Sequence, residues 1–210
     1  MNEQNLWKLV QDAKEAKPTA YQQTQYLTRV ISSYSAQSIL SLKNIYWKLL
    51  KSSFTADLWA AAYVLNNGCS EQNFLYFRNW LILQGQSTFK KAIQDPECLI
   101  DYLNLPLKEP LQEPDLHHKI ALLLTYKTDE DLSLIDYKDE EGSLQGEFWK
   151  NDSDIIDKVP LLCQMMGWGN EVPMGEWVSD NYTQHNSPAN KQYLQNSSLY
   201  YRDYILMKEV

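Results

Sequence analysis

The chain has 210 residues, of which 44% are hydrophobic and 22% charged, fractions typical of one globular domain or of one domain with a long extension. Its formal net charge of -8 disfavours binding to nucleic acid or to an anionic membrane surface, because both require a cationic face. No run of residues approaches the roughly 20 apolar residues of a membrane span, and residues 1–20 lack the apolar core of a signal peptide.

The first third of the chain predicts three helices. Apolar residues recur at helical spacing over residues 2–16, 18–34 and 35–50. Pro18 is expected in the first turn of the second helix, and Ser35 is expected to cap the third.

Residues 55–85 form the most apolar stretch, and we call this stretch the hub. Residues 55–66 have almost no polar face, which predicts a buried central helix. Gly68 is expected to end it in a left-handed conformation, and Ser70 is expected to cap a second apolar helix that ends at Gly85.

After a short helix over residues 87–94, three prolines within residues 106–114 predict an extended connector. This connector separates an all-helical domain, residues 1–105, from an acidic and aromatic-rich region, residues 115–210, that is expected to pack on it. The predicted fold is mainly α, a compact multi-helix domain with a less regular C-terminal half.

The C-terminal region begins with a helix over residues 115–125. Residues 144–149 predict a short strand or turn, so the fold leaves room for one short β-hairpin. Residues 155–166 have helical spacing that Pro160 would kink or restart.

Acidic residues concentrate in residues 129–157, which hold eleven Asp or Glu against two Lys, a balance of -9. Such a run is usually a solvated face. The alternative is a surface for a basic partner, with Asp139, Glu140 and Glu141 as the candidate binding residues.

Residues 167–177 form an aromatic loop with three glycines and one proline. Trp168 and Trp177 can anchor this loop to the helices. They can instead contact a partner, because tryptophan is enriched at binding hot spots.

Arg78 is placed on the apolar face of the second hub helix, between Phe74 and Leu81. A buried cation needs a partner, and Asp57 is the nearest candidate in the sequence. An ion pair between the two hub helices is the favoured interpretation, and an arginine that binds a carboxylate or phosphate ligand is the alternative.

Cys69 precedes the second hub helix, whose dipole would lower the pKa of the thiol. The possible bases are His117, His118 and His185, at spacings typical of no enzyme family. A small packed residue is the alternative interpretation, and it is favoured. With Cys98 and Cys163 the chain has three widely spaced cysteines, which predict free thiols and a cytoplasmic protein, with a disulfide between two of them as the alternative.

Metal and nucleotide motifs are missing from the sequence, so we expect no metal and no cofactor. The candidate pocket or structural motif of the hub consists of Asp57, Trp59, Cys69, Arg78 and Trp80.

Several strings carry a family resemblance: Leu6-Trp7, Asp57-Leu58-Trp59-Ala60-Ala61-Ala62-Tyr63, Gly68-Cys69-Ser70, Phe74, Tyr76-Phe77-Arg78, Trp80-Leu81, Gly85 and Asp95-Pro96. Together they resemble a bacterial domain-of-unknown-function family, number 4240, over about residues 3–104. Asn67 stands where that family usually has glycine, and asparagine tolerates the left-handed region. The resemblance implies an intracellular, mainly helical domain with no assigned activity, so it carries over no catalytic residue.

Two functions remain open. The first is a non-enzymatic protein-binding module, for example an immunity-type protein that binds a basic partner through the acidic residues 129–157. The second is a small-molecule-binding protein or enzyme with a pocket at the hub. The first is favoured.

Overall fold

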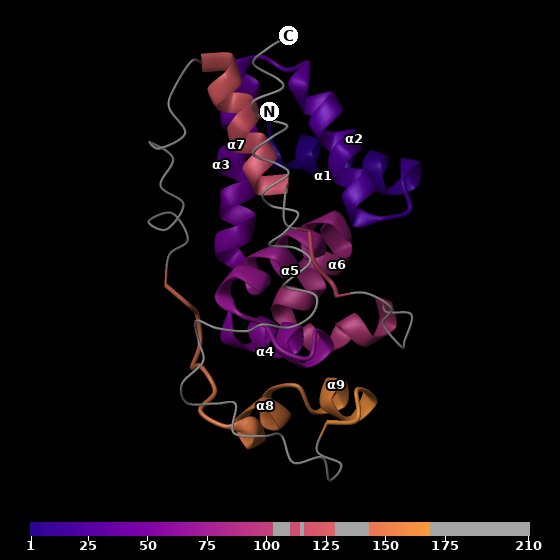
Figure 1. Cartoon of the computed structure of the whole chain (residues 1–210), viewed down its shortest axis with the longest axis vertical. Coiled ribbons are helices and arrows are strands. Elements are labelled where there is room, and N and C mark those ends of the chain that lie inside the picture. The colour runs from indigo at the N-terminus through magenta and orange to yellow at the C-terminus, as the bar shows by residue number, and fades with distance from the viewer. Residues whose placement is uncertain (103–109, 114–115, 129–142, 169–210) are drawn as a thin grey trace, which may run out of the picture. The chain divides into compact units, whose positions relative to one another are not determined.

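The computed structural model describes residues 1–102, 110–113, 116–128 and 143–168 (Figure 1). All of them belong to one compact unit, Met1–Pro173, and residues 174–210 lie outside the description. The described part is mostly helical, as predicted. Its elements are α1 (Glu3–Ala16), α2 (Ala20–Ser32), α3 (Ala36–Ser52), α4 (Ala56–Leu65), α5 (Glu71–Leu83), α6 (Gln86–Gln94), the 3-10 helix η1 (Pro96–Tyr102), α7 (Leu116–Thr128), α8 (Asp152–Lys158) and α9 (Pro160–Met165).

Side-chain caps set where most of the helices begin. The Ser35 side chain accepts a hydrogen bond from the Ser38 amide and caps α3, as predicted. Pro18 was expected in the first turn of α2, and this is wrong. The hydroxyl of Thr19 accepts from the Gln22 amide, so Thr19 is the cap and Pro18 precedes the helix.

The break between α4 and α5 is a left-handed helix end. The Gly68 amide donates to the Tyr63 carbonyl at 2.8 Å, and the Asn67 amide donates to the Val64 carbonyl. Gly68 has a positive φ of 117°, but the left-handed residue that ends α4 is Asn67, with φ 52°. The left-handed residue therefore lies one position earlier than predicted. Ser70 caps α5, as predicted.

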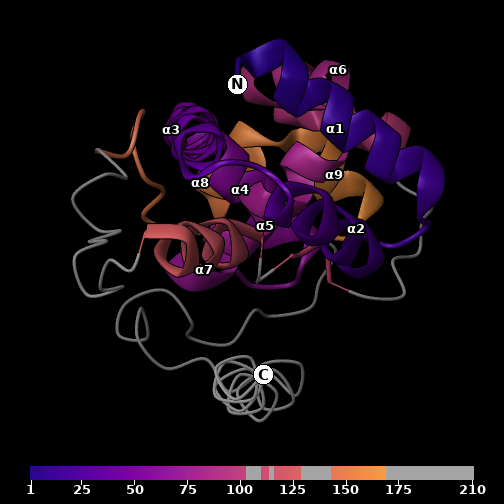
Figure 2. The same ribbon diagram turned by 90° about the horizontal axis from the view of Figure 1, so that it is seen from above.

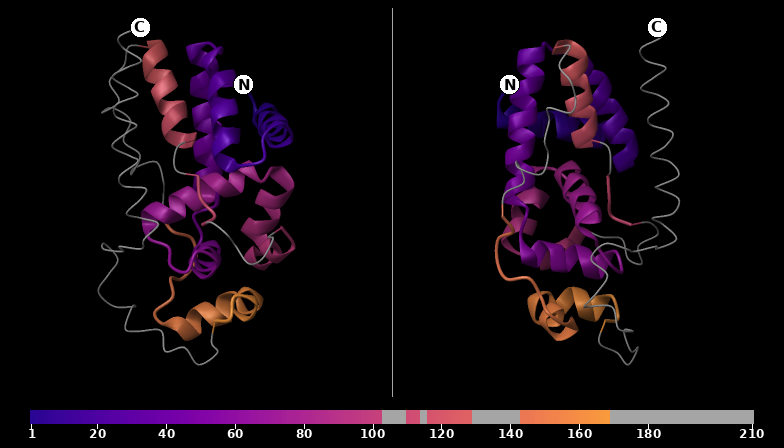
Figure 3. Two further views of the ribbon diagram at one scale, coloured as in Figure 1. Left: turned by 45° about the vertical axis from the view of Figure 1, so that its right-hand side comes forward. Right: turned by 60° about the vertical axis from the view of Figure 1, so that its left-hand side comes forward.

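Helix α5 lies in the middle of the helices. It contacts α1, α2, α3, α4 and α6, and Figure 2 shows it between them, with α3 seen nearly end-on. Helix α7 packs along α3 and α2, and Figure 3 shows α3 and α7 side by side. The second hub helix is thus enclosed on most sides.

The segment before α8 attaches to the start of α4. The Ala56 amide donates to the Gln145 carbonyl at 2.8 Å, and the Gln145 amide donates to the Phe54 carbonyl at 3.0 Å. This isolated parallel bridge stands where a short β-hairpin was considered, and the described residues contain no strand. Helices α8 and α9 then pack on α4, and Pro160 restarts the helix between them.

Four residues of the predicted connector are described, and they are tied to the hub. The Leu111 amide donates to Asn66 Oδ1 at 2.8 Å, and the Glu113 amide donates to the Tyr76 carbonyl at 2.9 Å. Residues 106–109 and 114 lie outside the description. In the described part, none of the helices combines the length and the apolar content that crossing a bilayer requires.

Candidate functional site

A group of polar side chains lies inside the molecule where α3, α5 and α7 approach one another. It consists of Tyr46, Arg78, Asn79, Glu113 and His117, which we call the polar cluster. Arg78 and Asn79 have no exposed surface, Tyr46 and Glu113 are each 1% exposed, and His117 is partly buried. Buried polar groups need partners because they have lost water, so the bonding within the cluster decides its chemistry.

Three members of the polar cluster form a chain of hydrogen bonds. The Tyr46 hydroxyl donates to Asn79 Oδ1 at 2.7 Å, and Asn79 Nδ2 lies 2.8 Å from His117 Nδ1. The tyrosine fixes the orientation of the amide, so Asn79 Nδ2 donates and His117 Nδ1 accepts. The proton of a neutral His117 is therefore on Nε2, and the chain joins α3, α5 and α7.

Burial keeps the titratable groups of this chain neutral. It lowers the pKa of His117 to about 3, and the positive charges of His118 and Arg78 act in the same direction. It also raises the pKa of Tyr46 well above 10, an effect that Glu113 increases and Arg78 opposes. At neutral pH His117 is therefore the neutral imidazole, and Tyr46 keeps its hydroxyl proton.

Arg78 is a fully enclosed cation, as predicted. Its Nη1 donates to the Leu50 carbonyl at 2.9 Å, and its Nε donates to the Phe74 carbonyl at 3.4 Å. The guanidinium carbon lies 4.8 Å from the ring centroids of both Phe54 and Phe74. Aromatic faces attract a cation, and the attraction grows where water is excluded.

The predicted ion pair between Asp57 and Arg78 is wrong. The Asp57 carboxylate accepts a hydrogen bond from Lys158 Nζ at 2.6 Å, and its side chain is 58% exposed. Asp57 lies on the face of α4 that meets α8, whereas Arg78 bonds the end of α3. The guanidinium therefore joins α5 to α3 and does not clamp the two hub helices.

Cys69 is a packed residue, the interpretation that the sequence favoured. The residue is 7% exposed, and burial raises the pKa of its thiol far above the usual range although Arg78 acts in the opposite direction. The expected lowering of this pKa is wrong, because desolvation by burial has the largest effect on the thiol. Of its possible bases, His117 Nδ1 is bonded to Asn79, and His185 lies outside the described residues.

The other two hub candidates are aromatic. Trp59 is 4% exposed and donates from Nε1 to the Cys69 carbonyl at 2.9 Å. Trp80 is partly buried and packs on Phe77, with 5.4 Å between ring centroids. Two surface hollows are lined by residues of the α1 and α2 region and by none of the five hub candidates. A ligand pocket at the hub stays a prediction.

One of the five candidate partner-binding residues is described. Trp168 follows α9 and contacts Tyr63, with 5.7 Å between ring centroids, so it anchors the start of its loop on α4. Asp139, Glu140, Glu141 and Trp177 lie outside the described residues. All three cysteines are free, as predicted. Among the residues described, no group of three or more His, Cys, Asp or Glu could hold a metal ion.

Sequence reasoning missed the polar cluster except for Arg78, because His117 was considered as a base for Cys69 and not as a partner of Asn79. A signal was present at Asn79, which follows Arg78 inside an apolar helix. Two successive polar residues inside an apolar helix indicate that the helix has a polar contact face in addition to its apolar one. Tyr46 and Glu113 carry no comparable signal, since tyrosine fits an apolar stripe and Glu113 lies among prolines.

The fold and the site thus define a class of protein: a mainly helical unit that encloses a polar cluster. The comparison with protein families agrees with the resemblance seen in the sequence. Residues 1–123 match the family described as "Protein of unknown function (DUF4240)", so the chain belongs to this family. Curated proteins and solved structures give no match to the chain.

Proposed function

We propose that this protein is a non-enzymatic binding module that captures a basic partner protein through its acidic region, residues 129–157. An immunity-type protein of the cytoplasm is one concrete form. The observation that carries the proposal is that the described part of this region presents carboxylates on a segment attached to the hub. Glu147 and Asp157 are exposed, and Asp152 is partly exposed.

Aromatic packing attaches this segment to the hub. Phe148 stacks on Trp149 with 3.8 Å between ring centroids. Both rings are nearly perpendicular to the Trp59 ring, with centroid distances of 5.2 and 6.2 Å. Ile155 of α8 is fully buried. A surface that is already ordered loses less conformational entropy when it binds a partner.

The local charges favour a cationic partner. Lys158 bonds Asp57, and the Asp154 carboxylate accepts from the Lys150 amide at 2.7 Å, so both side chains are already used. The remaining charges within residues 143–157 are three carboxylates, Glu147, Asp152 and Asp157, and one cation, the exposed Lys150. Complementary charge raises the association rate and selects the partner.

The polar cluster supports a non-enzymatic role. Burial lowers the pKa of His117 to about 3, far from the value that suits a base near neutral pH, and its Nδ1 already accepts from Asn79. Cys69 is the nucleophile candidate of the hub, and its burial holds it as the thiol. Both side chains stabilise the fold, which leaves the exposed charges as the groups open to a partner.

Charge reversal tests this proposal. The chain is immobilised, exposed to lysate of its source cells, and the captured proteins are quantified. We expect a basic protein whose capture falls about tenfold in Glu147→Lys/Asp157→Lys, because reversed charges repel it. The triple reversal of Asp139, Glu140 and Glu141 should reduce capture further.

The matched control is Glu15→Lys/Asp101→Lys, which changes the net charge by the same amount at exposed positions outside the acidic region. It should capture the partner as the wild type does. Equal capture by the wild type and both acidic-region variants would contradict the proposal. The purified partner should also bind more weakly as the salt concentration rises.

A further inference from the structure

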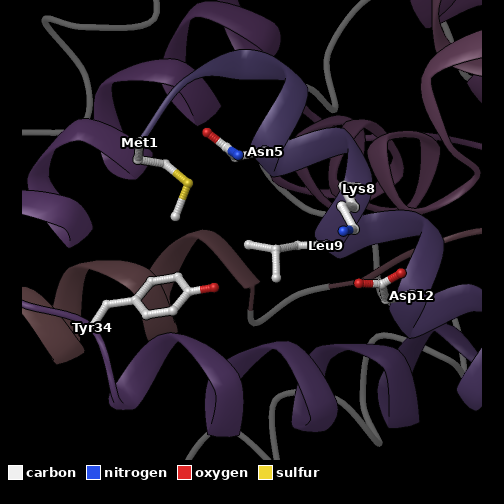
Figure 4. A pocket seen from close by; sticks show the side chains of 6 residues that line it. All are labelled: Met1, Asn5, Lys8, Leu9, Asp12 and Tyr34. Atoms are coloured by element: carbon white, nitrogen blue, oxygen red, sulfur yellow. The ribbon is translucent and has the colours of Figure 1, made fainter.

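A surface hollow of about 370 Å³ lies between α1 and the turn that joins α2 to α3 (Figure 4). It is lined by Met1, Asn5, Lys8, Leu9, Asp12 and Tyr34. This volume lies at the small end of the roughly 300–1,000 Å³ that small-molecule sites occupy. The hollow is remote in sequence from the acidic region, so its use is independent of the proposed function.

The hollow has an apolar part and a charged part. Figure 4 shows the Met1 thioether and the Tyr34 ring on one side, with Leu9 extending toward them from α1. Lys8 and Asp12 lie beyond Leu9. Met1, Leu9, Asp12 and Tyr34 are partly buried, so a small ligand has walls to contact.

Lys8 and Asp12 are one helical turn apart, yet they do not bond to each other. Neither side chain makes a hydrogen bond or ion pair with any residue that the structure describes. Other side chains of α1 do find partners: Gln11 Nε2 donates to Glu15 at 2.7 Å, and Lys14 Nζ donates to the Gln84 carbonyl at 2.9 Å. A lysine four residues before an acid is also the weaker order for a helical pair.

We infer that this hollow binds the zwitterion of an apolar α-amino acid. Its carboxylate would bond Lys8, its ammonium would bond Asp12, and its side chain would cover Leu9 and the Tyr34 ring. A simple anion would be repelled by Asp12, and a simple cation by Lys8. A zwitterion satisfies both charges, because its own two charges are adjacent.

The test is a titration of the ¹⁵N-labelled full-length chain with L-leucine, followed by amide chemical shifts. We expect saturable shifts near Asn5, Leu9 and Tyr34 with a dissociation constant of about 1 mM, as suits a half-open site. N-acetyl-leucine lacks the ammonium and leucinamide lacks the carboxylate. Each should bind at least about fivefold more weakly than leucine.

Two variants assign the charges. Each of Asp12→Asn and Lys8→Gln should weaken leucine binding about fivefold. In Asp12→Asn, N-acetyl-leucine should then bind as well as leucine, and in Lys8→Gln, leucinamide should. The controls Asp101→Asn and Lys51→Gln replace exposed charges outside the hollow and should bind leucine as the wild type does.

The inference would be overturned by shifts that do not saturate up to about 10 mM leucine, a range that covers weak small-molecule affinities. Equal binding of the three ligands would also overturn it, as would variants that bind like their controls. Circular dichroism checks that each variant is folded, and the two charge substitutions give independent readings.

Discussion

The two sides of α5 are held by different kinds of contact. Toward α4, the Phe74 ring stacks on Trp59 at 4.8 Å, and Trp59 meets Phe148 edge to face. Toward α3 and α7, Asn79 bonds Tyr46 and His117 through hydrogen bonds of 2.7 and 2.8 Å. Dispersion between rings depends weakly on direction, whereas a buried hydrogen bond leaves an unsatisfied group when one partner is lost. The polar side should therefore tolerate substitution less well than the aromatic side.

Arg78 should give the largest effect because it contacts both sides. Arg78→Met removes a buried cation and leaves the Leu50 carbonyl without its donor, so unfolding in urea should show a loss of about 3–5 kcal/mol. Arg29→Met, at an exposed site on α2, should change stability by less than about 0.5 kcal/mol. A loss below about 1 kcal/mol at Arg78 would mean that the guanidinium does not support the hub.

Acid should weaken the polar side through His117. Its pKa is about 3 in the folded chain against 6.5 for a free histidine, so the unfolded chain binds more protons between these values. The contribution of His117 is complete above pH 6.5 and is lost as the pH falls toward 3. The free energy of unfolding should change with pH by at most about 1.4 kcal/mol per pH unit because of this one group.

The check is urea unfolding at pH 6.5 and 4.5. The wild type should lose about 2 kcal/mol more than His117→Gln, which cannot titrate. His118→Gln, at an exposed neighbour, should keep most of the wild-type pH dependence, because burial is the largest cause of the lowered His117 pKa and the His118 charge only adds to it. Identical pH profiles for the wild type and His117→Gln would contradict this account.

Trp59→Phe probes the aromatic side and should cost less. A phenyl ring keeps much of the packing but cannot donate to the Cys69 carbonyl, so the free energy of unfolding should fall by about 1–2 kcal/mol. Trp80→Phe, a partly buried control in the same helix pair, should cost less than about 1 kcal/mol. The reverse order would indicate that the Trp59 hydrogen bond contributes little.

Asp57→Asn should have the smallest effect, below about 1 kcal/mol, because the Asp57 side chain is 58% exposed and water screens its pair with Lys158. Lys158→Gln should lower the free energy of unfolding by a similarly small amount in the same urea experiment. If Asp57→Asn instead cost as much as Arg78→Met, the carboxylate would be acting on the buried guanidinium after all.

The sequence predicted what local patterns determine. The hub helices follow from an almost continuous apolar run, and the Ser35 and Ser70 caps follow from residue type and position. The burial of Arg78 also follows from its place on an apolar stripe. These features depend on residues within a few turns of one another, so they can be seen without the fold.

The partners of the polar groups could not be predicted in this way. The acceptor of Arg78 is a backbone carbonyl at the end of α3, and the partner of Asp57 comes from α8. The pKa of Cys69 depends on how completely the surrounding helices exclude water, which a helix-terminus rule does not include. Each of these depends on segments that are distant in the chain, and proximity in the sequence was a poor guide.

The bridge at Gln145 has a consequence for the order of folding. By bonding Phe54 and Ala56, it closes a loop that contains every residue from α4 to α7. Closing so long a loop has a high entropic cost until the helices inside it have collapsed. Docking of residues 143–149 should therefore be a late event in folding, and native-state hydrogen exchange should find the amides of Gln145 and Ala56 among the first to open.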